Sequence, residues 1–247
     1  TGSTYQGWAN FSRSTYQGWA NFSRSTYQGW ADFSSSTYQG GADFTGSTYQ
    51  GGAYFTGSTY QWANFSRSTY QGWADFGSST YQSWANFTGS TYQGGANFSS
   101  STYKSKANFS GSIFYRETYF DTVLYNSFSR FTGCAPQFYD ETNHKNTLFG
   151  SHNNDFTVNT NEGYPINLNS ESLPLGCKFL TSEQKEYLEG KLQEIEKINN
   201  KLFEVKDLAK KTELSEKLRS LHEEFNKWRE EATTVKVEDV AAEDTKS

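Results

Sequence analysis

The first 112 residues of this 247-residue chain contain no leucine, isoleucine, valine or methionine. A core of branched aliphatic side chains is therefore excluded there. The apolar side chains that remain are those of Phe, Tyr, Trp and Ala. Any core in this region has to be a stack of aromatic rings separated by small residues.

Long apolar runs and strong charge are also missing. No run of about 18 apolar residues exists, so no membrane-spanning helix is predicted. The net charge of −5 divides into +2 for residues 1–112, −3 for residues 113–181 and −4 for residues 182–247. We expect no nucleic-acid partner, because the basic residues before position 112 are too sparse to follow a phosphate backbone. They are Arg13, Arg24, Arg67, Lys104 and Lys106.

Cysteine is scarce, with Cys134 and Cys177 only. The pair could close a disulfide, but two free thiols in a reducing compartment are favoured, and with them a cytoplasmic location. The chain also has no methionine and starts inside a repeat. We interpret it as a fragment whose N-terminus is missing, in which a signal peptide would not be visible.

Residue patterns typical of catalysis are absent. His144 and His152 lie near Asp140, Glu141 and Asp155, but their spacing matches no metal-binding motif. No phosphate-binding loop or nucleophile elbow occurs. We therefore expect a protein that is not an enzyme, with no catalytic residue, no metal site and no cofactor.

A repeat dominates the first half of the chain. The unit Ser-Thr-Tyr-Gln-Gly-Trp-Ala-Asn-Phe-Ser-Arg occurs unchanged at Ser3 to Arg13 and again at Ser14 to Arg24. Each unit places one Tyr and one Phe at alternating steps of six and five residues, and a small residue stands two positions before each ring. Only the step from Tyr60 to Phe65 is short, because a glycine is missing. The alternation continues less visibly through Phe114, Phe120, Tyr125 and Phe131.

This pattern predicts short extended segments. In a strand, alternate side chains face the same side, so the small residue and the ring both point inward. Ser, Thr and Gly after each ring suit tight corners. The chain is thus expected to wind into coils whose backbones pair and whose rings stack along the axis.

Ala-Asn-Phe-Ser-Arg, Ala-Asp-Phe-Ser-Ser and Ala-Asp-Phe-Thr-Gly resemble the signature of the pentapeptide-repeat family, in a Phe-rich variant with a double repeat of eleven residues. The resemblance implies a mainly β fold, a right-handed quadrilateral β-helix of about six coils with one pentapeptide on each face. A flattened two-sided solenoid with eleven residues per coil is the alternative. Some family members mimic DNA and inhibit topoisomerases through an acidic surface, which this nearly neutral repeat lacks.

Two outward positions of the repeat are candidate binding surfaces. A threonine row begins with Thr4, Thr15, Thr26 and Thr37 and could bind ice or polysaccharide. The position three before each Phe accepts Trp, Gly or Lys, which predicts partly exposed side chains in two clusters separated by a glycine stretch. The tryptophans are Trp8, Trp19, Trp30, Trp62, Trp73 and Trp84.

The pattern changes after the repeats. We expect a solenoid over residues 1–131, an irregular capping segment over 132–181, a helical tail over 182–232 and a disordered acidic end over 233–247. A capping box at Thr181 to Gln184 starts the tail. A heptad seam within it predicts either a hairpin that turns near residues 211–213 or a long helix that pairs with another chain. The seam consists of Leu214, Leu218, Leu221, Phe225 and Trp228.

These features favour a structural or interaction protein. The solenoid would act as a rigid scaffold, and the helical tail would self-associate or dock to a protein partner. The alternative is a surface-exposed module that binds carbohydrate or another ligand through the threonine rows and the tryptophan clusters. Topoisomerase inhibition by DNA mimicry is the least favoured hypothesis.

Overall fold

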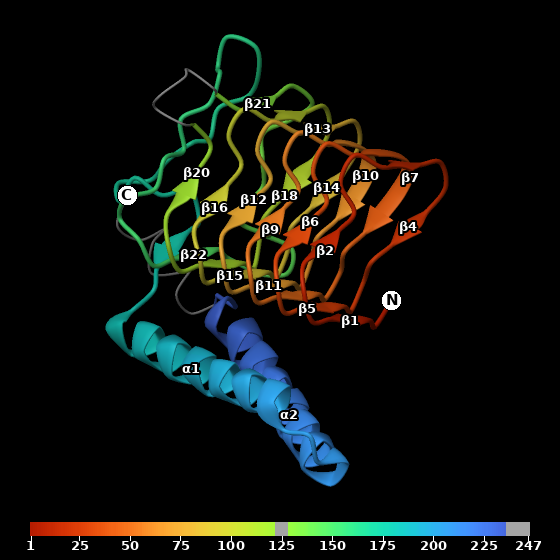
Figure 1. Cartoon of the computed structure of the whole chain (residues 1–247). Coiled ribbons are helices and arrows are strands. Elements are labelled where there is room, and N and C mark those ends of the chain that lie inside the picture. Colours follow the sequence, from red (N-terminus) through yellow and green to blue (C-terminus); the bar gives the residue numbers. More distant parts are fainter. Residues whose placement is uncertain (122–127, 236–247) are drawn as a thin grey trace.

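Two-residue strands at the expected Thr-Tyr and Ala-Asn positions build the first half of the chain. The computed structural model describes residues 1–121 and 128–235. The strands pair in parallel with the strands one coil away, and together they form a β-solenoid that is followed by two helices (Figure 1). The expected mainly β solenoid with a helical tail is confirmed.

The first face of the solenoid is an eight-stranded parallel sheet. Its strands, in order, are β1 (Thr4–Tyr5), β5 (Thr26–Tyr27), β8 (Thr48–Tyr49), β11 (Thr69–Tyr70), β15 (Thr91–Tyr92), β19 (Ile113–Phe114), β22 (Leu148–Phe149) and β23 (Lys178–Phe179). The second face is a six-stranded sheet. It contains β2 (Ala9–Asn10), β6 (Ala31–Asp32), β9 (Ala53–Tyr54), β12 (Ala74–Asp75), β16 (Ala96–Asn97) and β20 (Thr118–Tyr119).

The third and fourth faces share a nine-stranded sheet, because β7 (Thr37–Asp43) and β10 (Thr59–Asn64) run through the edge between them. The third face also holds β3 (Thr15–Tyr16), β13 (Thr80–Tyr81), β17 (Thr102–Tyr103) and β21 (Arg130–Phe131). The fourth holds β4 (Ala20–Asn21), β14 (Ala85–Asn86) and β18 (Ala107–Asn108).

The register shows that one coil takes two repeat units. Thr4 pairs with Thr26, 22 residues on, whereas Thr48 pairs with Thr69 because the glycine is missing in that coil. The alternative with eleven residues per coil is therefore excluded. Between Tyr5 and Phe114 the first face holds six levels separated by five turns.

Four ladders of stacked rings fill the interior, one for each face. Ring centroids within a ladder are 4.4 to 5.3 Å apart in the repeats, with nearly parallel planes. Rings of neighbouring ladders meet edge to face, as Phe55 and Phe65 do at 4.9 Å and 76°. Offset stacks and edge-to-face pairs are the arrangements that aromatic rings prefer.

The small residue before each tyrosine has a second role that its size does not reveal. The backbone N–H of Ser58 donates to the hydroxyl of Ser79 at 3.2 Å, and the Ser58 hydroxyl donates to the Phe33 carbonyl at 3.1 Å. The same pair of bonds recurs at Ser47, Ser68 and Ser90. The serine column thus satisfies backbone groups that the short strands leave unpaired at the corners.

The corners explain the Asn and Asp row. Asn10 accepts a bond from the Ser12 N–H at 2.9 Å and Asp32 one from the Ser34 N–H at 2.9 Å, which closes an Asx turn around the Phe that follows each of these strands. Tyr54 stands at this position before Phe55 and cannot form the same turn. The following corner residue has a positive φ, for example 54° at Arg13 and 66° at Gly46. Asn and Asp therefore shape the turn as well as facing outward.

Ring stacking continues beyond the repeats. Phe131 lies 22 residues, one regular coil, after Phe109, so the repeat spacing would place it on Phe109. It stacks instead on Tyr103 at 4.7 Å, and Phe138 stacks on Phe109. Phe149 continues the ladder of Phe114. Tyr125, which the alternation names as a further ring, lies outside the described residues. The segment after Phe131 thus adds further rings to the stacks, and longer loops connect these rings along the chain.

The tail is a helical hairpin. The helix α1 (Ser182–Glu204) starts at the expected capping box, in which Thr181 Oγ1 accepts from the Gln184 N–H and Gln184 Oε1 accepts from the Thr181 N–H. The helix α2 (Leu208–Ala232) begins after Asp207, whose carboxylate accepts from the Lys210 N–H at 2.9 Å. The turn therefore lies at residues 205–207 and not near residues 211–213, because Asp207 caps a helix.

Replacing one inward ring should test the ladders. Phe55→Ala is expected to lower the free energy of unfolding by about 3–5 kcal/mol, because the Phe55 ring is fully buried between stacked neighbours. Urea unfolding followed by far-UV circular dichroism measures this. Tyr49→Phe is the control, since it keeps the ring and removes a buried hydroxyl that has no hydrogen-bond partner in the described part of the chain. An equal loss in both variants would contradict ring stacking as the source of stability.

Candidate functional site

The predicted threonine surface is divided between two faces. Thr4 pairs with Thr26 on the first face, and Thr15 pairs with Thr37 on the third face. Successive repeat units fall on different sides of the coil because one coil takes two units. The first-face row runs through Thr48, Thr69 and Thr91, and then changes to Ile113 and Leu148.

This change of the outward row marks the place where the hairpin lies on the solenoid. Ile113 and Leu148 form a buried cluster with Leu180, Leu188 of α1 and Phe225 of α2. Tyr115, Leu192 and Trp228 pack around it. The sequence carried a signal for this contact, because the first aliphatic residue of the chain stands at an outward threonine position.

We call the start of α1 and the end of α2, which lie on Ile113 and Leu148, the base of the hairpin. Polar bonds hold both helices to the solenoid there. The Tyr115 hydroxyl donates to the Glu189 carboxylate of α1, and burial raises the pKa of Tyr115 to about 12. Lys145 forms an ion pair with Glu230 at 2.8 Å and also donates to the Glu230 carbonyl. The Val235 N–H donates to the His144 carbonyl at 2.8 Å. Residues 236–247 of the expected disordered end lie outside the described residues.

The heptad seam is used within the chain. Leu221 packs with Ile195 and Ile198 of α1, and Leu214 and Leu218 lie at the margin of the same cluster. Trp228 stacks on Tyr187 at 4.8 Å. The ion pair Lys191–Glu224, at 2.9 Å, joins the two helices on their surface. Of the two arrangements that the seam allows, the structure has the hairpin.

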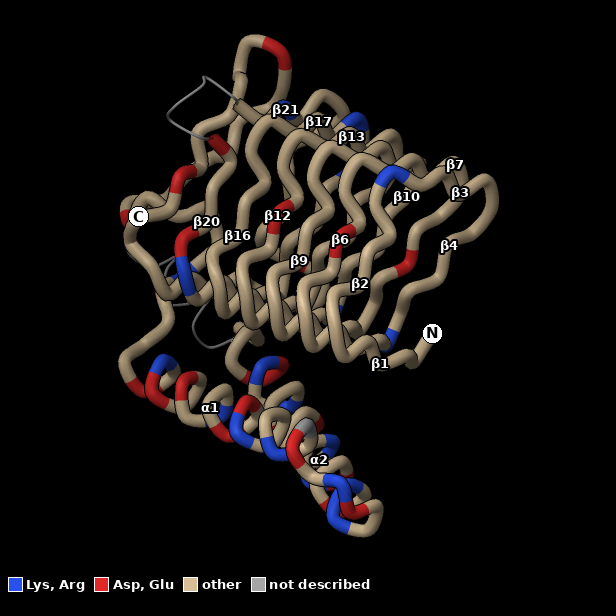
Figure 2. Tube along the Cα trace, viewed as in Figure 1, with Lys and Arg blue, Asp and Glu red and all other residues tan. Residues whose placement is uncertain are grey.

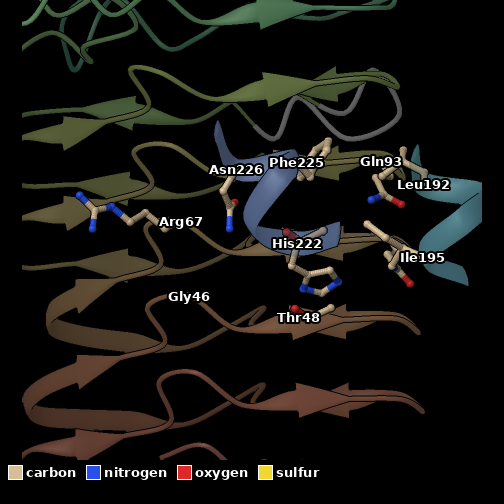
Figure 3. A pocket seen from close by; sticks show the side chains of 11 residues that line it. Gly46, Thr48, Arg67, Gln93, Leu192, Ile195, His222, Phe225 and Asn226 are labelled. Carbon is tan, nitrogen blue, oxygen red and sulfur yellow. The ribbon is translucent and has the colours of Figure 1, made fainter. Parts of the chain in front are cut away.

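A narrow crevice separates α2 from the first face (Figure 3). Thr48, Arg67 and Gln93 line it from the solenoid, and His222 and Phe225 line it from α2. Burial lowers the pKa of His222. The volume of about 50 Å³ holds one or two water molecules and is far below the 300 Å³ or so of typical ligand pockets. This crevice is therefore no site for an organic ligand.

A wider polar cleft of about 350 Å³ lies beside the end of α2. Its charged side chains are Arg67, Lys145, Asp140 and Glu230. Their charges cancel, and Lys145 is already paired with Glu230. The cleft therefore offers no net attraction for an ionic ligand.

Arg229 is buried in the hairpin base without adequate partners. Its Nε and Nη1 atoms have no hydrogen-bond partner within residues 1–121 and 128–235, and its Nη2 is 3.9 Å from Glu230. Burial lowers the pKa of Arg229 to about 10, and the positive charge of Arg67 acts in the same direction. We therefore expect this guanidinium to weaken the contact between hairpin and solenoid.

The tryptophans form two rows on opposite edges of the coil. Trp8, Trp30 and Trp73 lie between the first and second faces, and their exposed fractions are 67, 60 and 40 %. Trp19, Trp62 and Trp84 lie between the third and fourth faces. The expected two clusters in chain order do not occur, since successive units alternate between the two edges.

The remaining candidates show no reactive centre. Cys134 and Cys177 are both free thiols, and burial raises the pKa of Cys177 to about 12, so it stays protonated. His152 packs on Phe179 with ring centroids 4.0 Å apart. Among residues 1–121 and 128–235 no group of three or more His, Cys, Asp or Glu could hold a metal ion. No helix in the same ranges is long and apolar enough to cross a membrane.

Fold and surfaces together define a parallel β-solenoid with an aromatic core and a helical hairpin that packs on its first face. A family model described as pentapeptide repeats, in nine copies, matches residues 39–80. The coils that contain residues 39–80 are therefore similar to pentapeptide repeats. No curated protein and no solved structure matches the chain.

Restoring the repeat residue at position 113 should loosen the hairpin. Ile113→Thr places a hydroxyl against Leu188 and Phe225, and an unpaired buried hydroxyl costs about 1–3 kcal/mol. Hydrogen exchange of the α1 and α2 amides is expected to accelerate while that of β5 to β15 does not change. Thr26→Ile, at an equivalent half-buried position of the row that does not line the crevice under the hairpin, is the matched control. Unchanged exchange in the helices of the Ile113→Thr variant would contradict the assigned contact.

Removing the buried charge of α2 should have the opposite effect. Arg229→Met keeps the length of the side chain and eliminates the unpaired guanidinium, so the hairpin contact is expected to gain about 1–4 kcal/mol. The measurement is the exchange protection of α2 amides. Lys145→Met, which removes a paired cation, should lower the protection instead. Lower protection in Arg229→Met would show that the guanidinium stabilises the base.

Proposed function

We propose that this chain is a non-enzymatic scaffold in which the solenoid is a rigid support and the helical hairpin docks a protein partner. The pentapeptide-repeat fold supports a structural repeat scaffold. The core consists of stacked rings with alanine and serine between them, which leaves little room for internal motion. Such a body is suited to hold a docking element rigidly.

The arrangement of the hairpin carries the docking proposal. Its base is held on Ile113 and Leu148, whereas its other end extends away from the solenoid (Figure 1). The cluster of Ile195, Ile198 and Leu221 holds the two helices together independently of the solenoid. At the free end, Leu208 is 79 % exposed. An exposed leucine on a projecting turn is a natural contact for a partner.

Charge indicates which partner would fit. Charged residues are sparse on the solenoid strands and dense on the helices (Figure 2). Residues 197–211, the tip of the hairpin, carry a net charge of +3, and the rest of the two helices is acidic. The tip therefore favours a partner with an acidic surface around an apolar contact. DNA mimicry is disfavoured, because the first 112 residues contain only Asp32, Asp43 and Asp75 as acidic residues.

Site-specific photo-cross-linking tests the docking proposal. A photoreactive phenylalanine analogue at Leu208, in the full chain expressed in its native cells, is expected to give one discrete protein adduct. The same analogue at Ser35, an exposed solenoid corner, is the control and should give none. Lys206→Glu with Lys210→Glu should reduce the Leu208 adduct at least tenfold. An adduct with a second copy would assign the tip to self-association, and absence of any adduct would contradict docking.

A further inference from the structure

The tryptophan row between the third and fourth faces forms a continuous aromatic surface. We call Trp19, Trp62 and Trp84 the indole row. The rings of Trp19 and Trp62 have centroids 5.0 Å apart with planes tilted by 34°, and those of Trp62 and Trp84 are 6.0 Å apart with planes tilted by 55°, so the row is a twisted platform. A Cβ atom on Gly41, which lies in the coil between Trp19 and Trp62, would overlap the Trp19 ring. The glycine thus lets the indole lie flat across the backbone and reach the next tryptophan.

Covering a glycine uses only one side of such an indole. Trp19 remains 62 % exposed and Trp84 remains 37 % exposed, so large apolar areas face the solvent. A contiguous exposed apolar surface on a folded protein is typical of a binding site. The row lies on the side of the solenoid opposite the first face, and the hairpin does not cover it.

The surroundings of the indole row indicate a neutral ligand with many hydroxyl groups. The side chains of Gln17, Gln39 and Gln61 are exposed beside the row and offer amide donors and acceptors. Asn64 is half-buried on the other side of the row, and its Oδ1 accepts from the buried Asn86 side chain at 3.1 Å. Asp43 is the only charged residue of β4, β7, β10 and β14, and its carboxylate accepts from the Thr45 N–H. Lys106 holds the position of Trp84 in the next coil and Lys104 lies near it in the chain, so the cations of this edge stand at one end of the indole row and not between its rings.

We propose that the indole row binds a neutral β-1,4-linked polysaccharide that runs parallel to the solenoid axis. The C–H faces of pyranose rings pack on flat indoles, and their hydroxyl groups bond to amides. The backbone rises by three coil steps between Trp19 and Trp84, but the rings lean together, and their centroids follow one another at 5.0 and 6.0 Å. Such a row fits an extended β-1,4-linked chain, whereas an α-linked chain coils away from it.

Affinity electrophoresis of the full chain tests this proposal. Native gels that contain hydroxyethylcellulose or glycol chitin are expected to retard the protein, and a gel that contains soluble starch is not. Trp19→Ala combined with Trp84→Ala should raise the apparent dissociation constant at least tenfold. Trp8→Ala is the matched control, because Trp8 is 67 % exposed at the opposite edge, and it should leave retardation unchanged.

Two further measurements keep the outcome unambiguous. Thermal unfolding shows whether each variant retains the fold, and Trp19→Tyr, which keeps an aromatic platform, should lose less affinity than Trp19→Ala. No retardation in either β-linked gel would overturn the proposal. So would an equal loss of retardation in Trp8→Ala, or retardation that disappears with added salt, since a neutral ligand binds without ionic attraction.

Discussion

Stacking of aromatic rings in exact register along the axis is the constraint on which the rest of this structure depends. A shift by one residue would turn every ring of a strand outward. The coil that lacks a glycine shows how strictly the register is kept. Tyr60 still pairs with Tyr38, and the pairing shifts only between Tyr60 and Trp62, where β10 runs straight through the edge. The missing residue is thus absorbed at the edge, and the ladders of Tyr60 and Phe65 continue undisturbed.

Inward-facing residues determine the core of the coil, and outward-facing residues determine what binds or packs on its surface. The inward positions repeat almost without change, and they continue through Phe131, Phe138 and Phe149 after the regular spacing has ended. The outward positions differ from coil to coil and decide what lies on each face. On the first face the row of Thr48, Thr69 and the buried Thr91 changes to Ile113, which forms the apolar contact with the hairpin. Surface function can therefore vary along this solenoid at little cost to its core.

Local patterns could be predicted from the sequence, and relations across the coil could not. The inward rings, the corner residues and the capping box of Thr181 follow from neighbours in the chain. The hydroxyl column of Ser58 and Ser79, the stacking of Phe131 on Tyr103 and the seat at Ile113 depend on which residues meet after a full turn. The sequence left a coil of 22 residues and one of 11 both open, so the tryptophans could not be assigned to two edges.

The outward position that accepts Trp, Gly or Lys varies along the chain, but the residue allowed there depends on the residue at the same position in the neighbouring coil. Considered one residue at a time, it looks permissive. Across coils, Gly41 and Gly95 are the residues over which the rings of Trp19 and Trp73 lie, and a side chain at either glycine would displace a ring. Trp and Gly at this position are therefore complementary and depend on each other at a separation of one coil. Such pairs hold the indole rings against the backbone with one side open to solvent. Packing between coils is therefore sufficient to produce the exposed aromatic surface.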